Sequence, residues 1–244
     1  MTAPSLLRLF LPFVALALLC PALPAAPTVE PAPRTFRIFT VVTAITDLKY
    51  DPAPAKPVPL LISQNPGSPY PIPRDNRVSL YKEIPPPPSA PPGTPPKKVI
   101  IAEAVVPADA PRVLIAVIPD ETGRLSTHVI PDDPALHPVG RLRFINLSRF
   151  QAALALNKDK HLLEPGKATL LGWPKTGGIL VQVAAQKDGT WESVLRRERR
   201  ARTTARTYCI VFDYAPDPEQ YLTDPSNPPP ATVRFFFENA PAAP

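Results

Sequence analysis

Cysteine and glycine are scarce in this chain, and their scarcity narrows the chemistry that it can carry. The 244 residues include 2 cysteines and 9 glycines. So few glycines leave little room for a Gly-rich phosphate loop, and the HExxH, CxxC, EF-hand and nucleophile-elbow patterns are all absent from the sequence. We therefore predict a protein that is not an enzyme and that needs no cofactor or metal. A catalytic site built from scattered loops is the less favoured alternative.

The two cysteines lie far apart, which limits disulfide formation. Cys20 belongs to an N-terminal segment that we expect to be removed, so Cys209 is the sole cysteine of the mature protein and cannot form an internal disulfide. The stretch Tyr208–Phe212 is an apolar strand pattern, in which a cysteine packs as a small hydrophobic residue. No histidine lies near it in sequence to act as the base of a catalytic thiol. We predict a buried structural residue.

Residues 1–25 have the pattern of a secretory signal peptide. Arg8 precedes an apolar run, Leu9–Leu19, and small residues follow at Ala22 and Ala25, the two expected cleavage positions. A membrane-spanning helix needs about 20 apolar residues to cross a hydrocarbon core of about 30 Å, and this run is shorter. We expect an exported protein, periplasmic or extracellular, with no retained transmembrane span.

Proline, in contrast to glycine, is abundant in this chain. The 39 prolines are roughly three times ordinary usage and disfavour helices. They gather in a leader (residues 26–34), in a loop (residues 84–96) and in other loops between apolar segments. Eight prolines lie within residues 85–96, so we expect that loop to be extended and partly polyproline II. It either bridges two strands of one domain, the interpretation that we favour, or separates two domains.

The apolar segments between these loops have the length and alternation of β-strands. Phe36, Ile38 and Thr40 alternate with their neighbours, and Lys187–Thr190 is a strong hairpin-turn signal. Short strands separated by turns roughly every 8–12 residues are typical of an antiparallel sandwich or barrel. We predict an all-β, antiparallel β-sandwich with little helix outside the signal peptide. It spans residues 35–238 as one large or two small domains and is followed by a flexible tail, 239–244.

The expected strands are Thr35–Tyr50 (at least its first part), Val58–Ser63, Val78–Lys82, Val99–Val106, Val113–Pro119, Leu125–Ile130, Gly140–Leu147, Gln151–Asn157, Ala168–Leu171, Ile179–Gln186, Trp191–Leu195, Arg206–Tyr214 and Thr232–Glu238.

Three short motifs follow one another in the second half of the chain. They are Pro131-Asp132-Asp133, then PVGRLRFINLS over Pro138–Ser148, then Leu163–Gly166. In this order they resemble a group of uncharacterised bacterial secreted proteins with a DD turn, a PxGxxRFxNLS strand and an LxPG turn. The resemblance covers roughly residues 113–214 and implies an exported, Ig-like β-sandwich. It implies no catalytic or binding residue.

All of the excess positive charge of the mature chain lies in one segment. The formal charge is +6, and loss of Arg8 leaves 26 basic against 21 acidic residues. Residues 196–206 (RRERRARTTAR) carry +5, so the rest of the mature chain sums to zero. Guanidinium groups bind phosphate, sulfate and carboxylate bidentately, which makes this segment the candidate anion-binding site. Its residues are Arg196, Arg197, Arg199, Arg200, Arg202 and Arg206. The structural alternative is a segment without a ligand, either a solvated hairpin tip or the polar face of the two strands that it joins, Trp191–Leu195 and Arg206–Tyr214.

The closest approach to a metal-binding pattern is His128, Asp132, Asp133 and His137. Prolines interrupt this stretch, and an Asp-Asp pair between prolines is ordinary turn chemistry. We therefore interpret it as a turn and predict no metal site.

Two other motifs have both a functional and a structural interpretation. Asn146-Leu147-Ser148 fits an N-glycosylation sequon, which is uninformative in a bacterial host. Trp173 and Trp191 could form a carbohydrate platform, but we favour core or sheet-edge positions for both.

These features predict an exported, non-catalytic β-sandwich protein with a binding or structural role in the cell envelope. The alternative function is binding of an anionic surface or glycan through the Arg196–Arg206 segment. The expected partners are anionic polysaccharide, lipid headgroups or an envelope protein. Nucleic acid is disfavoured by export and by the lack of aromatic residues between Trp191 and Tyr208, which stacking on bases would require.

Overall fold

Strands account for the regular secondary structure of the computed structural model, which describes residues 33–42, 44–120, 122–175, 177–213 and 229–239. Within these ranges there are sixteen strands and no helix, hence no helix long and apolar enough to cross a membrane. The expected signal peptide lies outside the described residues. The strands are β1 (Thr35–Thr40), β2 (Ile45–Tyr50), β3 (Val58–Ile62), β4 (Tyr70–Pro71), β5 (Arg77–Ile84), β6 (Lys97–Val105), β7 (Arg112–Pro119), β8 (Leu125–Pro131), β9 (Arg141–Asn146), β10 (Gln151–Leu156), β11 (Asp159–Leu163), β12 (Ala168–Gly172), β13 (Ile179–Lys187), β14 (Thr190–Arg199), β15 (Ala205–Asp213) and β16 (Ala231–Asn239).

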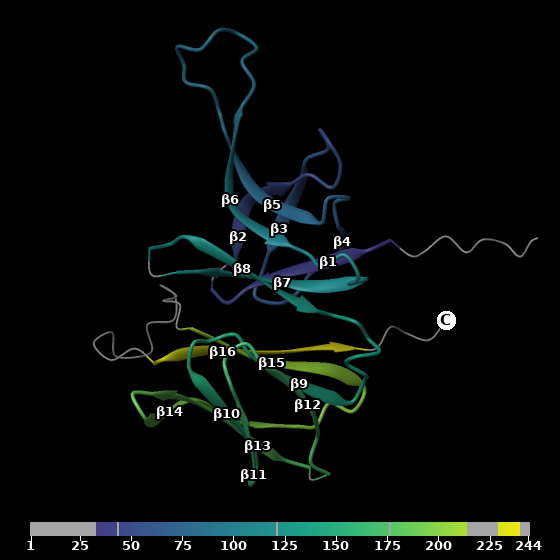
Figure 1. Cartoon of the computed structure of the whole chain (residues 1–244), viewed down its shortest axis with the longest axis vertical. Coiled ribbons are helices and arrows are strands. Elements are labelled where there is room, and N and C mark those ends of the chain that lie inside the picture. Colours follow the sequence, from purple (N-terminus) through teal and green to yellow (C-terminus); the bar gives the residue numbers. More distant parts are fainter. Residues whose placement is uncertain (1–32, 43, 121, 176, 214–228, 240–244) are drawn as a thin grey trace, which may run out of the picture. The chain divides into compact units, whose positions relative to one another are not determined.

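The strands form four sheets of four strands each (Figure 1). Their orders are β4-β1-β7-β8, β3-β2-β5-β6, β12-β9-β15-β16 and β11-β10-β13-β14. Each order has two open edges, so none of these sheets closes into a barrel, and the predicted β-sandwich is confirmed. Most neighbouring strands are antiparallel, as predicted, whereas β1 with β7 and β9 with β15 are parallel pairs.

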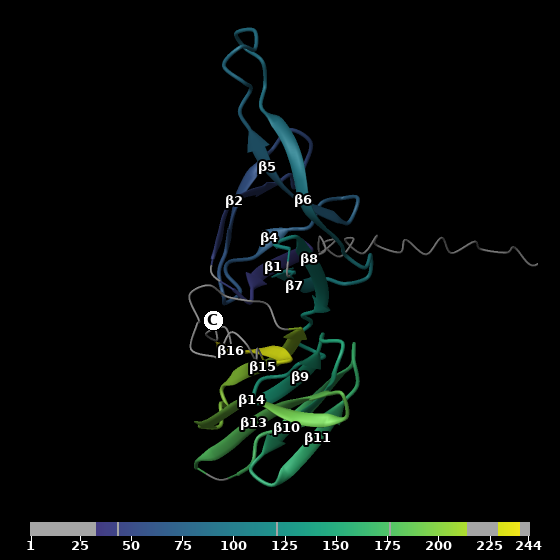
Figure 2. The same cartoon turned by 90° about the vertical axis from the view of Figure 1, so that its left-hand side faces the viewer.

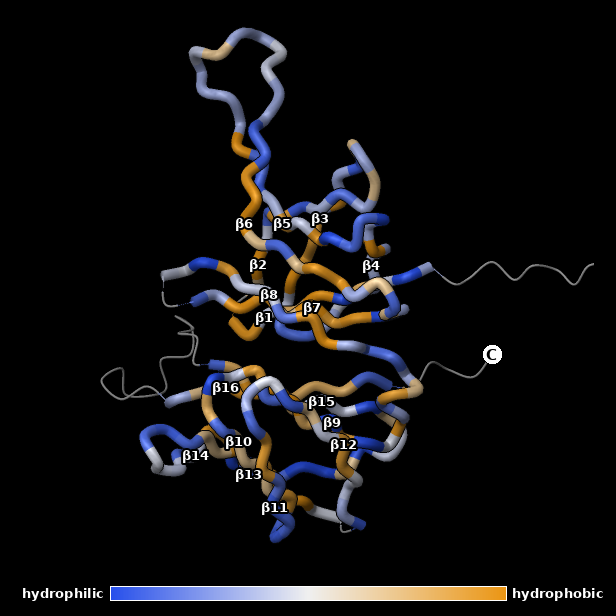
Figure 3. The backbone as a smooth tube through the Cα atoms, viewed as in Figure 1, coloured by the Kyte–Doolittle hydropathy of each residue, from blue (hydrophilic) through white to orange (hydrophobic). Residues whose placement is uncertain are grey.

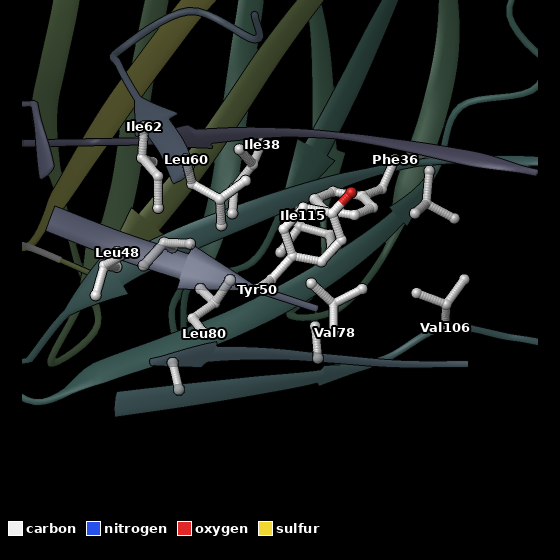
Figure 4. Close-up of a cluster of buried hydrophobic side chains, with 14 residues drawn as sticks. Phe36, Ile38, Leu48, Tyr50, Leu60, Ile62, Val78, Leu80, Val106 and Ile115 are labelled. Carbon is white, nitrogen blue, oxygen red and sulfur yellow. The ribbon is translucent and has the colours of Figure 1, made fainter. Parts of the chain in front are cut away.

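The first two sheets enclose a common hydrophobic core (Figure 4). Phe36, Ile38 and Ile115 come from one sheet, Leu48 and Leu80 from the other, and none of these side chains is more than 1% exposed. Side chains alternate between the two faces of a strand, so the alternation along β1 directs every second residue into this core.

The other two sheets enclose a core of the same kind. Phe144 and Cys209 belong to one of these sheets and Leu154 and Val183 to the other. Cys209 is completely buried, as its strand pattern predicts, and burial raises the pKa of its thiol to about 12. The thiol therefore stays protonated at neutral pH and lacks the thiolate character of a nucleophile.

β1–β8 and β9–β16 have the same topology. When eight is added to each strand number, the orders of the first two sheets become those of the other two, and the parallel pair β1–β7 becomes the parallel pair β9–β15. The described chain is therefore an internal duplication of an eight-stranded sandwich. We call the two copies repeat 1 (β1–β8) and repeat 2 (β9–β16).

The strand registers identify equivalent residues in the two repeats. Phe36 of β1 lies opposite Val113 of β7, and Leu142 of β9 lies opposite Thr207 of β15. When residues are counted along the strands from these two pairs, three charged positions of repeat 1 match charged positions of repeat 2. Arg37 is equivalent to Arg143, Arg112 to Arg206, and Asp132 to Glu238.

The Pro-rich loop is an insertion in repeat 1. It joins β5 to β6, whereas the equivalent strands β13 and β14 are joined by two residues, Asp188-Gly189 (Figures 1 and 2). Hydrogen bonds of 2.9 and 3.2 Å close two β-turns in the loop, Pro87–Ala90 and Pro91–Thr94. The prediction of an extended chain is therefore wrong for the middle of the loop, where these two turns bend the chain. Since β5 pairs with β6, the loop bridges two strands of one sheet.

A third hydrophobic core joins the β4-β1-β7-β8 sheet of repeat 1 to the β12-β9-β15-β16 sheet of repeat 2. The ring of Phe39 in β1 lies edge-on to Phe212 and Phe236, with centroids 6.3 and 5.3 Å apart. Tyr208 stacks on Phe236 at 4.8 Å. Strand β7 is consequently buried on both faces, which explains its continuous hydrophobic sequence (Figure 3).

Replacement of Gly140, immediately before β9, by alanine is expected to lower the free energy of unfolding by about 1–3 kcal/mol. Its φ of +77° is left-handed, and an added Cβ would lie 2.9 Å from the Thr203 carbonyl oxygen. Gly166→Ala is the matched control, because Gly166 has a φ of +72° but open space around it. Urea denaturation of both variants measures the difference. Equal losses would show that only the backbone conformation matters at Gly140.

Candidate functional site

Five arginines of the predicted anion-binding segment lie at one edge of repeat 2. The end of β14, an edge strand, carries Arg196, Arg197 and Arg199, and Arg200 and Arg202 follow in the loop before β15. All except Arg199 are exposed. We call these five residues the arginine surface. None of them forms an ion pair with a carboxylate in the part of the chain that the structure describes.

The arginine surface is not the tip of a hairpin. β14 extends to Arg199, beyond its predicted end at Leu195, and pairs with β13 from Thr190 to Arg199 with one register shift. The chain then crosses to β15, which belongs to the other sheet of repeat 2. The segment thus spans the open side of the sandwich, where β14 and β16 are the two edge strands.

Two arginines of this surface lie over aromatic rings of β16. The guanidinium carbon of Arg199 is 5.2 Å from the centroid of Phe235, and that of Arg202 is 4.2 Å from the centroid of Phe237. Such cation–π contacts hold the planar guanidinium group in place. A hollow of about 350 Å³, lined by Arg199, Arg200 and Glu198 among others, adjoins them. The surface therefore offers partly ordered guanidinium groups to an anionic ligand.

Arg206, the sixth arginine of the predicted site, lies apart from this surface. It is 5% exposed and forms ion pairs with Asp132 and Glu238. Position 206 is the second residue of β15, and its side chain points toward repeat 1. An arginine that is buried and paired in this way is not available to an external anion.

Arg206 belongs to a charged cluster between the repeats, which we call the junction network. Its members are Arg37, Arg112, Asp132, Arg206 and Glu238. Asp132 forms ion pairs with Arg37 at 2.7 Å, with Arg112 at 3.3 Å and with Arg206 at 3.3 Å. Glu238 pairs with Arg37 at 2.8 Å. The network contains the equivalent pairs Arg112/Arg206 and Asp132/Glu238, so the same positions of both repeats meet there.

The side chain of Asp132 is almost completely buried, and its charge depends on its neighbours. Burial by itself would raise the pKa of this carboxyl group, but Arg37, Tyr208 and Arg206 outweigh burial and hold the pKa below its usual range. The Tyr208 hydroxyl donates a hydrogen bond of 2.5 Å to Asp132. Burial and the Asp132 carboxylate in turn raise the pKa of the Tyr208 phenol. Asp132 is therefore an anion and Tyr208 a neutral donor at neutral pH.

The four residues His128, Asp132, Asp133 and His137, which approach a metal-binding pattern in the sequence, have other contacts in the structure. Asp132 is held by arginines, and Asp133 accepts a hydrogen bond from the Ala135 amide at 2.9 Å within a turn. His137 is buried edge-on against Tyr208 at 4.5 Å, with its Nε2 3.1 Å from the Arg141 carbonyl oxygen. His128 lines a separate pocket. No group of three or more potential metal ligands occurs among the described residues.

The sequon asparagine and the two tryptophans differ in exposure. Asn146 is completely buried, and its side-chain amide donates to the Phe150 and Leu163 carbonyl oxygens at 2.7 and 2.9 Å. The folded chain therefore does not present it for glycosylation. Trp173 packs against the core of repeat 2, and Trp191, which is 41% exposed, lies on the edge strand β14. Both positions are of the predicted kinds.

No family model and no curated protein matches this chain. Assignment of function therefore depends on the chemistry of the described residues. That chemistry comprises a solvent-facing arginine surface, a partly buried junction network and the pocket beside His128.

Proposed function

We propose that this is an exported, non-catalytic binding protein of the cell envelope whose arginine surface attaches it to an anionic polymer or membrane surface. The observation that carries the proposal is the clustering of Arg196, Arg197, Arg199, Arg200 and Arg202 without an ion-paired carboxylate among the described residues. The signal-peptide pattern of residues 1–25 supports export.

The chemistry of the arginine surface favours carboxylate, sulfate and phosphate groups. Each guanidinium group has several N–H donors in a fixed plane, and such a plane matches two oxygens of an oxyanion. Arg199 and Arg202 are supported by phenyl rings, which reduces the conformational freedom that binding has to remove. Several weak contacts on one surface add up when the ligand is a polymer or a membrane that repeats its charges. Acidic polysaccharide and anionic lipid headgroups share this chemistry.

Substitution of the four exposed arginines by serine is expected to weaken binding to polyanions at least about tenfold. The variant carries Arg196→Ser, Arg197→Ser, Arg200→Ser and Arg202→Ser, and it leaves the half-buried Arg199 in place. Retention on heparin and on anionic lipid vesicles is measured across a salt series. Binding of the unmodified protein should fall as salt rises, because solvent-exposed ion pairs are screened.

A control of equal charge loss separates a specific surface from net charge. Lys158, Lys160, Lys167 and Lys175 are exposed lysines of repeat 2 outside the arginine surface. Their fourfold serine variant should be retained like the unmodified protein. If both fourfold variants lose retention equally, the arginine surface is not a site. Selective retention on heparin identifies a polysaccharide ligand, and selective retention on vesicles identifies lipid headgroups.

A further inference from the structure

A pocket of about 520 Å³ lies where β7, β13 and β15 end and β8 begins. None of its lining residues belongs to the arginine surface. Its volume is within the roughly 300–1,000 Å³ that small-molecule sites occupy. Both repeats line it, through residues such as Ile118 and His128 of repeat 1 and Phe150 and Asp213 of repeat 2. We propose that this pocket binds a neutral sugar ring.

His128 supplies a hydrogen-bonding group that the described residues leave unused. It lies on β8 opposite Ala116, so it faces the side of the sheet that meets repeat 2. Neither of its ring nitrogens is hydrogen-bonded to a described residue, and the side chain is half-buried at the pocket. Burial lowers the pKa of His128, with an opposing effect of Asp213. The neutral imidazole therefore offers one donor and one acceptor to a ligand.

The charges of the pocket balance one another. Arg149 and Lys187 are the cations, and Asp120 and Asp213 are the carboxylates. Asp213 accepts a hydrogen bond from the Arg149 amide at 2.9 Å, and one Asp120 oxygen is held by its own turn. A pocket with balanced charge favours a ligand without net charge. Because donors and acceptors both line it, the ligand should donate and accept at neighbouring positions, as adjacent sugar hydroxyls do.

The remaining wall of the pocket is apolar. Ile118, Leu147 and Phe150 contribute hydrocarbon surface, and Pro229 and Pro230 add two rigid rings. A pyranose ring has C–H faces that pack on such surfaces and hydroxyls at its rim that reach polar groups. A purely apolar ligand would leave the His128 imidazole without a hydrogen-bond partner, and a polyanion would meet two carboxylates. A neutral sugar satisfies both parts of the lining.

The pocket is independent of the proposed arginine surface. Lys187 lies opposite Thr190 at one end of the β13–β14 hairpin, and Ile179 lies opposite Arg199 at the other end. With a rise of about 3.3 Å per residue, the two ends are roughly 25 Å apart. Loss of one site therefore leaves the other intact, and the two proposals can fail separately.

Histidine NMR tests the pocket directly, because the chain has 3 histidines. Methyl glucoside, methyl galactoside and methyl mannoside are titrated into the purified protein. At least one of them should shift the His128 imidazole signals in a saturable way, while the signals of His161 on β11 stay in place. His137, packed on Tyr208, reports whether the junction between the repeats remains folded.

Variants of the polar lining locate the binding. Asp213→Asn and Arg149→Ser should each weaken sugar binding at least about tenfold, because a sugar hydroxyl loses a hydrogen bond to a charged group. Lys160→Ser on β11 is the matched surface control and should bind like the unmodified protein, as should the fourfold variant of the arginine surface. Arg149 is exposed, so its variant keeps the test valid if Asp213→Asn unfolds the protein.

Three results would overturn the proposal. The His128 signals could remain unchanged with all three glycosides, or His128 and His161 could shift together as in non-specific binding. Alternatively, glucuronate could bind more tightly than the neutral sugars and be displaced by salt, which would make the pocket an anion site.

Discussion

Replacement of Asp132 by asparagine is expected to lower the free energy of unfolding by about 3–5 kcal/mol. The carboxylate is 1% exposed and pairs with Arg37, Arg112 and Arg206. Without it, Glu238 is the one remaining carboxylate of the junction network beside three arginines, so part of their positive charge is no longer compensated. Urea denaturation at neutral pH measures the loss. Asp109→Asn, at an exposed aspartate outside the ion pairs, is the control and should change stability by less than about 0.5 kcal/mol.

The same variant has a defined pH dependence. The pKa of Asp132 is lowered in the folded protein, so its contribution to stability is present above the unfolded pKa of about 3.9 and is lost as pH falls through the folded value. The stability difference between the unmodified protein and Asp132→Asn should therefore be largest near neutral pH and shrink in acid. A difference that does not change with pH would show that asparagine fails for a steric reason rather than for lack of charge.

Phe39→Ala is expected to cost about 3–5 kcal/mol as well, through loss of packing between the repeats. Phe39 belongs to repeat 1, is completely buried and lies edge-on to Phe212 and Phe236 of repeat 2. Truncation removes both aromatic contacts and leaves a cavity in the core that joins the two sheets. Chemical denaturation followed by circular dichroism measures the loss.

Phe237→Ala provides the matched control for this substitution. Phe237 lies on β16 and is 48% exposed, so the same truncation there removes less buried surface and leaves no enclosed cavity. Its cost should be much smaller than that of Phe39→Ala. Similar costs for both variants would mean that the third hydrophobic core does little to hold the described chain together.

The fold class and most strands follow from local sequence patterns, because alternation and turn residues act over a few positions. Val113–Pro119 differs from β7 by one residue, and Ile179–Gln186 differs from β13 by one. The end of β14 is missed because an edge strand needs no buried face, and charged residues on both sides hide the alternation. β4, with two residues, is too short for any periodicity.

The duplication is not visible in local patterns, because it concerns which strands are neighbours. The signal in the sequence is weak: Phe-Arg-Ile-Phe in β1 corresponds to Leu-Arg-Phe-Ile in β9, with one identical residue in register. Hydrophobic residues replace one another freely at buried positions if volume is conserved, so topology persists where identity does not.

Local charge density locates the exposed cluster of arginines, because an exposed cluster needs no distant partner. The role of the arginine surface as an anion-binding site stays a prediction. Local charge density wrongly groups Arg206 with the exposed arginines. Arg206 is instead paired with Asp132, which is distant in the chain, and with Glu238, which lies on another strand. Asp132 looks like a turn residue for the same reason. The pocket beside His128 could not be anticipated, because its lining comes from segments of both repeats.

The junction network has the reciprocity of a symmetric dimer interface. Arg112 of repeat 1 pairs with Glu238 of repeat 2, and their equivalents, Arg206 and Asp132, pair in the opposite direction. Such two-way matching is the property of an isologous contact, in which one surface meets another copy of itself. In assembly terms the described chain is built like a homodimer whose two subunits are joined into one polypeptide. The link fixes the local concentration of the second half, so the two halves can diverge in sequence without losing each other as partners.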